Sequence, residues 1–208
     1  MLRIWGRANS VNVQKVLWCC AEIDLPFERR DAGMQFGVND QPAYLAMNPT
    51  GRIPTIEDGD FQLWESHAIV RYLALQYAPA AALYPAAPKN RAGVERWLDW
   101  ALSTLQPAER PVFWGYIRTP PDQRDTKALQ EQANAVAALW AIVDRQLAGR
   151  DFLEADQFTL ADLVLGTYAR RWFGIPDITA PPMPNLKRWY SSLETRDGFR
   201  QYIAPPLS

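Results

Sequence analysis

The chain has 208 residues, of which 22 are basic and 23 acidic, and its formal net charge is −1. This balance argues against nucleic acid or an anionic membrane as a partner. No apolar run reaches the ~20 residues that a membrane-spanning helix needs. With 48% hydrophobic residues the chain can bury a sizeable core. The nearly neutral charge favours a small-molecule or protein partner.

The first residues alternate between strand and helix signals. Residues 2–5 are predicted to form a strand that ends at Gly6. Asn9 and Ser10 offer helix-capping side chains, and apolar residues then recur at helical spacing through residue 20. A second strand is predicted at residues 25–29, and a short helix at 41–47 after a polar connection.

Cys19 and Cys20 stand next to each other in the first predicted helix, and the chain has no other cysteine to pair with either. Two reduced thiols indicate a reducing, cytoplasmic compartment. The first residues also lack the apolar segment of a signal peptide, so no secretion signal is expected.

Residues 48–73 carry the densest set of backbone signals, NPTGRIPTIEDGDFQLWESHAIVRYL. Asn48-Pro49 ends the preceding helix, because proline disfavours the α conformation at the residue before it. Ile53-Pro54 opens a short strand whose proline cannot donate to a sheet, which leaves the backbone of Ile53 free to bind a peptide-like ligand. Asp58-Gly59 predicts a hairpin, and Glu65-Ser66 stands where the next helix begins.

The predicted order over residues 1–78 is β-α-β-α-β-β-α, which matches a thioredoxin-like domain. Residues 79–90 contain three prolines and are predicted to be a linker. Helices then dominate, at residues 91–105, 122–147, 160–173 and 184–193, and Pro107 and Pro111 are expected to end or kink the first of them. Thr159 and Asp162 have the spacing of a capping box, which is interpreted as a folding device.

The run at residues 48–73 resembles the glutathione-binding half of cytosolic glutathione transferases, in which Asn-Pro, a basic residue, an aliphatic-Pro pair and a Glu/Asp-Ser pair occur at this spacing. The resemblance implies a thioredoxin-like domain at residues 1–78 and an all-helical domain at 91–208 that contributes the second-substrate pocket. It also implies a cis Ile53-Pro54 bond, glutathione as co-substrate, no metal, and a homodimer. The apolar face made by Val94, Trp97, Leu98 and Ala101 is a plausible dimer surface.

Ser10 follows the first strand, where serine-type (theta- or delta-like) members of the family place the hydroxyl that donates to the glutathione sulfur. Such a donor favours the thiolate, because a free thiol with a pKa of about 8.5 is mostly protonated at neutral pH. From the residues alone, a helix cap is the preferred interpretation of Ser10, and the resemblance favours the donor role instead. Asn12 stands where many serine-type members have proline, so its amide is an alternative donor, and Asn9 is a third.

Glu65 and Ser66 offer an acceptor and a donor at a helix N-terminus, which suits the α-amino acid end of the γ-glutamyl group. Arg52 is a candidate for the glycine carboxylate, or a solvated loop cation. His67, the only histidine, invites the role of a base, but a position beside the ligand or on the surface is the preferred interpretation.

Aromatic residues of the helical half could line an apolar second-substrate pocket or simply fill the core: Phe113, Trp114 and Trp172 are the candidates, with Tyr116 and Phe173 as neighbours. Arg110 and Arg118 hint at an anionic substrate group. The leading hypothesis is conjugation of the glutathione thiolate to small electrophilic, largely apolar substrates, with reduction of organic hydroperoxides as a further activity. The alternative is a non-catalytic glutathione-binding or structural module of the same fold.

Overall fold

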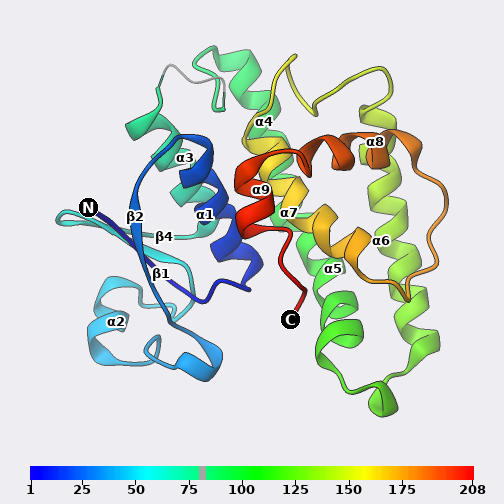
Figure 1. Cartoon of the computed structure of the whole chain (residues 1–208), viewed down its shortest axis with the longest axis horizontal. Helices are drawn as coiled ribbons and strands as arrows, with labels where there is room; N and C mark the ends of the chain where they lie inside the picture. Colours follow the sequence, from blue (N-terminus) through cyan, green and yellow to red (C-terminus); the bar gives the residue numbers. More distant parts are fainter. Residues whose placement is uncertain (80–82) are drawn as a thin grey trace.

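The computed structural model describes residues 1–79 and 83–208. Figure 1 shows a small sheet with its helices on one side of the molecule and a larger group of helices on the other. Part of the predicted linker, residues 80–82, lies outside the described residues. Within the described residues, no helix is both long and apolar enough to cross a membrane.

The sheet has four short strands in the order β2-β1-β3-β4, with β1 parallel to β2 and antiparallel to β3. Side chains alternate across β1, so Leu2 and Ile4 are buried while Arg3 and Trp5 are half-buried. The four strands confirm the prediction, with small shifts at their ends: β1 (Leu2–Trp5), β2 (Phe27–Arg30), β3 (Thr55–Asp58) and β4 (Phe61–Trp64).

Three helices complete the N-terminal domain: α1 (Val11–Glu22), α2 (Pro42–Met47) and α3 (Ser66–Tyr77). In Figure 1, α1 and α3 lie toward the helical half, and α2 lies apart from them. Trp5 of β1 meets the buried Tyr44 of α2 edge to face, with ring centroids 6.2 Å apart. A single 3₁₀ turn at Met34–Phe36 interrupts the polar connection. The β-α-β-α-β-β-α order and the thioredoxin-like domain are therefore confirmed.

The C-terminal half is helical, as predicted: α4 (Pro88–Trp100), α5 (Gln106–Phe113), α6 (Thr126–Gln146), α7 (Leu160–Gly174), α8 (Pro184–Leu193) and α9 (Asp197–Tyr202). Two starts differ from the prediction. Helix α4 already begins at Pro88, because proline is well suited to the first turn of a helix. Helix α6 begins only after Asp125, whose carboxylate accepts from the Ala128 N–H at 3.0 Å. Helix α9 was not predicted.

Pro107 and Pro111 were expected to end or to kink the helix, and they do not end it. The helical path continues from α4 through residues 101–105 into α5 and on through 114–118. Both connecting stretches are π-helical: the Gln106 N–H donates to the Ala101 carbonyl, and the Thr119 N–H to the Trp114 carbonyl, each five residues back. Proline removes an N–H from the regular ladder, and these wider turns carry the hydrogen bonding before and after the two prolines.

Helix α7 forms the centre of the helical domain and is buried along most of its length. Its capping box is confirmed, since Asp162 accepts from the Thr159 N–H at 3.0 Å and the Thr159 hydroxyl accepts from the Ala161 N–H. Asp162 also accepts from the Leu153 N–H and from the Trp189 indole, both at 2.9 Å. One buried carboxylate therefore ties the helix start to a preceding loop and to α8.

The two domains meet where α1 packs on α7 and α9. The Trp18 ring of α1 lies against Gly166 of α7, so close that a Cβ added to Gly166 would stand 3.1 Å from the ring. Trp18 also contacts Phe199 of α9. The apolar face of α4 and the residue after it was expected to form a dimer contact. It is instead buried in the chain's own core, which corrects that expectation: Val94, Trp97, Leu98 and Ala101.

Candidate active site

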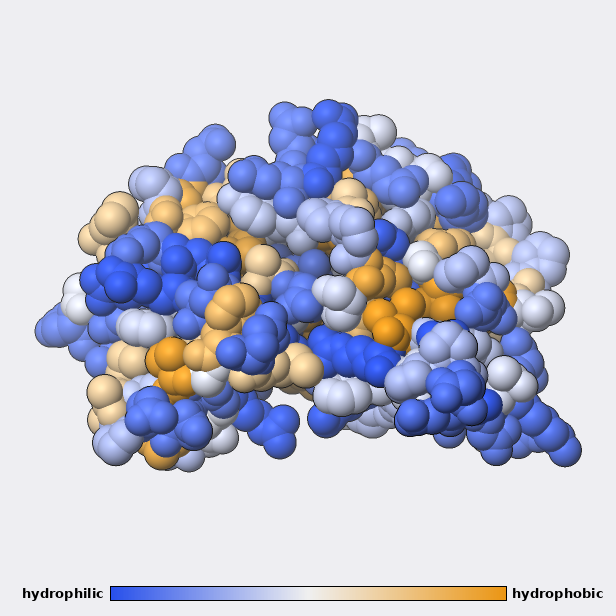
Figure 2. Space-filling view, turned by 60° about the horizontal axis from the view of Figure 1, so that its bottom comes forward, coloured by the Kyte–Doolittle hydropathy of each residue, from blue (hydrophilic) through white to orange (hydrophobic). Residues whose placement is uncertain are grey.

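Two cavities of about 260 Å³ each lie side by side between the domains and share lining residues. The first extends from the start of α1 to the face of α5, and the second from the loop before β3 to the start of α3. Figure 2 shows the molecule hollowed between its two lobes. The shared lining residues are Asn12, Arg52, Ile53 and Gln106. Such a paired cleft has room for a peptide-like ligand beside a second small molecule.

The loop before β3 presents its backbone to both cavities. The Ile53-Pro54 bond is cis, as predicted. Asn48 braces the loop by donating to the Arg52 carbonyl at 2.9 Å and to the Thr55 hydroxyl at 3.0 Å. Among the described residues, the N–H and C=O of Ile53 have no hydrogen-bond partner, so they are free to pair with an extended ligand.

Glu65 and Ser66 both line the second cavity, at the N-terminus of α3. Ser66 is buried and Glu65 is exposed. Glu65 has φ of +71°, a conformation that costs about 1–3 kcal/mol for residues other than glycine and is typical of functional sites. The helix end supplies free N–H groups and a positive partial charge beside the carboxylate of Glu65. A ligand that carries an ammonium and a carboxylate on one carbon fits this site. Its ammonium matches the carboxylate of Glu65, and its carboxylate matches the free N–H groups of the helix end.

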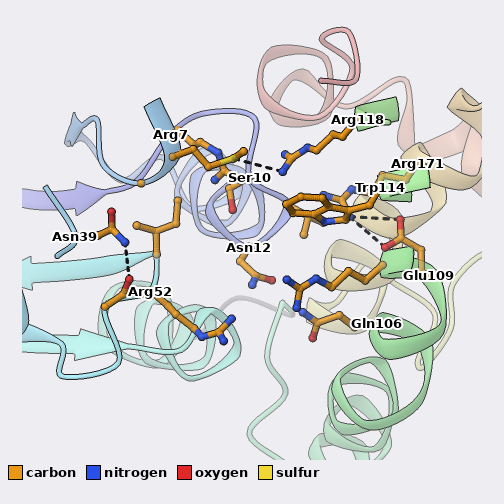
Figure 3. A pocket seen from close by; sticks show the side chains of 16 residues that line it. Arg7, Ser10, Asn12, Asn39, Arg52, Gln106, Glu109, Trp114, Arg118 and Arg171 are labelled. Atoms are coloured by element: carbon orange, nitrogen blue, oxygen red, sulfur yellow. Dashed lines mark hydrogen bonds and ion pairs between the residues drawn. The ribbon is translucent and has the colours of Figure 1, made fainter. Parts of the chain in front are cut away.

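Ser10 lines the first cavity at the start of α1. It occupies the N-cap position, yet its hydroxyl makes no capping hydrogen bond. The capping role that the sequence left open is therefore not the role of this side chain. Ser10 is buried, and Figure 3 shows it pointing into the cavity beside Asn12. Asn9 lies outside both cavities and donates to the Ser208 hydroxyl at 2.8 Å.

A fully buried lysine holds Asn12 in place. Lys15 Nζ donates to Asn12 Oδ1 at 3.0 Å and to the Tyr168 hydroxyl at 2.9 Å, and it lies 2.9 Å from Nε2 of His67. Since the amide oxygen of Asn12 is taken, its NH₂ group is the part left to donate into the cavities. Burial, with a further contribution from Arg171, lowers the pKa of Lys15 to about 7.

His67 is buried in this network rather than placed on the surface. Burial and the neighbouring Lys15 lower the pKa of its imidazole to about 2, so the ring is neutral at physiological pH. Neither cavity is lined by His67. The imidazole therefore serves the Lys15 contact and is not a base for chemistry in the cleft.

Helix α5 and its π-helical continuation form the opposite wall, through side chains spaced four residues apart: Gln106, Arg110, Trp114 and Arg118. Trp114 is exposed and faces Ser10 across the cavity (Figure 3). Glu109 stands beside this row and is fully buried, where it accepts from Arg171 at 3.1 Å. Burial raises the pKa of Glu109, and the Arg171 guanidinium opposes this rise.

The aromatic prediction needs correction. Trp114 lines the first cavity, whereas Phe113 and Trp172 are buried in the core and line neither. Tyr116 and Phe173 also lie outside both cavities. Helical spacing alone does not distinguish core from cavity wall, because both faces of these helices carry aromatic rings. The wall is cationic where an apolar one was expected.

Sequence reasoning missed several lining or supporting residues: Arg7, Lys15, Asn39, Gln106, Glu109 and Arg171. The four-residue spacing from Gln106 to Arg118 was a visible signal for one helix face. Nothing in the sequence marked Lys15, which is buried among the apolar residues of α1. Among the described residues, no group of three or more His, Cys, Asp or Glu side chains could hold a metal ion.

Comparisons with known proteins agree with this geometry. Residues 1–75 match the family model "Glutathione S-transferase, N-terminal domain", and residues 98–197 match "Glutathione S-transferase, C-terminal domain". The chain is 41% identical to "Glutathione S-transferase GstB" of Escherichia coli, with all of both chains covered. It is 30% identical to "Glutathione S-transferase 3" of Zea mays, over 98% of this chain and 93% of the other.

Among solved structures, a theta class glutathione S-transferase of Xanthomonas axonopodis pv. citri, crystallised with glutathione bound, superposes with a TM-score of 0.94. The two sequences are 43% identical, and the match covers 100% of this chain and 99% of that one. The similarity therefore extends over both domains and the cleft between them.

Proposed function

Because this chain belongs to the glutathione S-transferase family, we propose that it joins the glutathione thiolate to a small electrophile in the cleft between its domains. An enzyme of this family uses glutathione as its co-substrate. The observation that carries the proposal is the position of two uncommitted donors, the Ser10 hydroxyl and the Asn12 amide, beside the free backbone of Ile53.

Glutathione is proposed to lie along the cis loop, with its γ-glutamyl end in the second cavity. There Glu65 pairs with the ammonium, and Ser66 with the N–H groups of α3 binds the carboxylate. The cysteinyl part pairs with the N–H and C=O of Ile53, and Arg52 binds the glycine carboxylate. This pose places the sulfur near Ser10 and Asn12, where both cavities meet.

In the chemical step, the sulfur forms a bond to the electrophilic carbon while the bond to the leaving group breaks. The thiol proton is released to solvent before attack. A donor to the sulfur, together with the positive end of α1, stabilises the thiolate and lowers the pKa of the bound thiol. Ser10 or Asn12 supplies that donor.

We also propose that the protein is a cytoplasmic homodimer. Two free, buried thiols at Cys19 and Cys20 support a reducing compartment. Exposed apolar side chains on β4 and α3 support a contact surface there: Phe61, Leu75 and Tyr77.

The test is calorimetric titration of glutathione, followed by turnover with aryl halides, epoxides and hydroperoxides. Glu65→Gln should weaken glutathione binding by about 1.5–3 kcal/mol, the value of a hydrogen bond to a charged group. Glu131→Gln changes another exposed carboxylate, on α6, and is the matched control that should bind like the wild type. Tight binding without turnover of any electrophile would favour the non-catalytic module instead.

A further inference from the structure

We propose that the electrophile of this enzyme carries an anionic group, such as a carboxylate, which Arg7 and Arg118 bind at the end of the first cavity opposite Arg52. The inference rests on the proposed function, since it names the class of its second substrate. Figure 3 shows Arg7 and Arg118 together at one end of the cavity, with Arg52 and Gln106 at the other.

The first cavity is strongly cationic although the chain as a whole is nearly neutral. Among the described residues, Glu109 is the only acid in its lining, and it pairs with Arg171 at 3.1 Å. The arginines that line it are Arg7, Arg52, Arg110, Arg118 and Arg171. Four positive charges therefore remain without an acid in the lining, in a site partly shielded from water, where charges act more strongly than at the surface.

Arg7 is the clearest sign of a missing partner. It follows β1 and is half-buried, and its Nε is buried without a hydrogen-bond partner among the described residues. Burial lowers the pKa of Arg7, and the charges of Arg118 and Arg171 lower it further. A buried donor without an acceptor and two neighbouring like charges are both unfavourable, and an anion between the guanidinium groups relieves both.

Among the described residues, no Asp or Glu side chain pairs with Arg118. It donates to the main-chain oxygen of Ser208 at 3.2 Å and to the Met34 sulfur at 3.4 Å. Its guanidinium also lies 4.6 Å from the Trp114 ring centre, and Arg110 lies 5.7 Å from the same ring. The ring of Trp114 thus gives a flat apolar wall next to unpaired positive charge. A planar electrophile with a carboxylate at one edge fits this combination.

Two probes isolate the charge: 4-chloro-3-nitrobenzoate and its neutral analogue 4-chloro-3-nitrobenzamide. In both, the thiolate attacks the carbon that bears chlorine, the C–S bond forms, the C–Cl bond breaks and chloride leaves. Each enzymatic kcat/KM is divided by the rate constant of the spontaneous reaction with glutathione, which removes the difference in intrinsic reactivity.

We expect the benzoate to be favoured at least about tenfold in the wild type. Arg7→Gln and Arg118→Gln should each lower the benzoate value about tenfold or more, as expected for loss of a hydrogen bond to a charged group, and should change the benzamide value little. Arg145→Gln removes an exposed arginine of α6 outside both cavities and should leave both values unchanged. Added salt should weaken the benzoate preference.

A binding experiment separates this inference from the proposed function. S-methylglutathione fills the glutathione site without a thiol, and 3-nitrobenzoate is then titrated by calorimetry. Binding that Arg118→Gln abolishes, with no turnover of either probe or of the epoxides and hydroperoxides, supports the anion site and refutes the transferase activity. Equal turnover of both probes, unchanged in Arg118→Gln, overturns the anion site and leaves the transferase. Loss of glutathione affinity in both arginine variants, without loss of benzoate preference, also overturns it.

Discussion

Lys15 gives a direct test of the buried network behind the candidate active site. The side chain is fully buried on α1 and contacts Asn12, His67 and Tyr168. Burial is the main cause that lowers its pKa from 10.5 to about 7, and the nearby Glu109 and Glu65 only partly offset it. Lys15→Met keeps a similar volume and removes the charge.

The lowered pKa of Lys15 determines whether the free energy of unfolding rises or falls with pH. Between pH 7 and pH 10.5 the unfolded chain holds the Lys15 proton more often than the folded chain does, so the free energy of unfolding rises with pH in this window. One full proton of difference is worth about 1.4 kcal/mol per pH unit. Since Lys15 is half-titrated near pH 7, its contribution between pH 7 and pH 9 is about 2 kcal/mol.

The assay is urea unfolding of the wild type and Lys15→Met at pH 7, 8 and 9. His67 does not titrate in this window, because its pKa is lowered to about 2. The raised pKa values of Cys19 and Cys20 give the opposite trend near pH 9, but both thiols are present in each protein and cancel in the difference. The wild type should gain about 2 kcal/mol relative to the variant as pH rises.

Lys127→Met, which removes an exposed lysine of α6, is the matched control and should retain the wild-type slope. Parallel pH profiles for the wild type and Lys15→Met would refute the reasoning. In that case the lysine would be charged throughout the window, and its partners would compensate fully for burial.

Three further predictions concern the sulfur donor, the helix cap and assembly. If Ser10 donates to the sulfur, Ser10→Ala should raise the pKa of the bound thiol and slow turnover roughly ten- to a hundredfold at neutral pH. Thiolate absorbance against pH would assign the role to Asn12 if only Asn12→Ala raised that pKa. Asp162→Ala should lower the free energy of unfolding by about 3 kcal/mol or more in urea titrations, because it leaves several buried donors unpaired; a loss below about 1 kcal/mol, typical of a cap alone, would contradict this. Light scattering at micromolar concentration should give the mass of a dimer, and a monomer would refute the assembly.

Much of the fold was predictable because its signals are local. The hairpin at Asp58-Gly59 and the capping box at Thr159 each depend on a few neighbouring residues. Alternation and helical periodicity gave the strands and most helices for the same reason. The cis Ile53-Pro54 bond was predicted from the family resemblance instead, because most X-Pro bonds are trans. The proline-containing helix was less predictable, since its hydrogen bonding adjusts through wide turns that no local pattern specifies.

The chemical character of the cleft was decided by tertiary structure. Periodicity indicates that a helix has an apolar face, but not which neighbour covers that face, so Trp172 and Trp114 could not be told apart. An almost neutral composition likewise conceals a local excess of charge. Arg7 and Arg118 come from opposite domains and become neighbours only when the domains pack. The strength of an electrostatic interaction depends on the distance between the charges and on their burial, and the sequence by itself specifies neither.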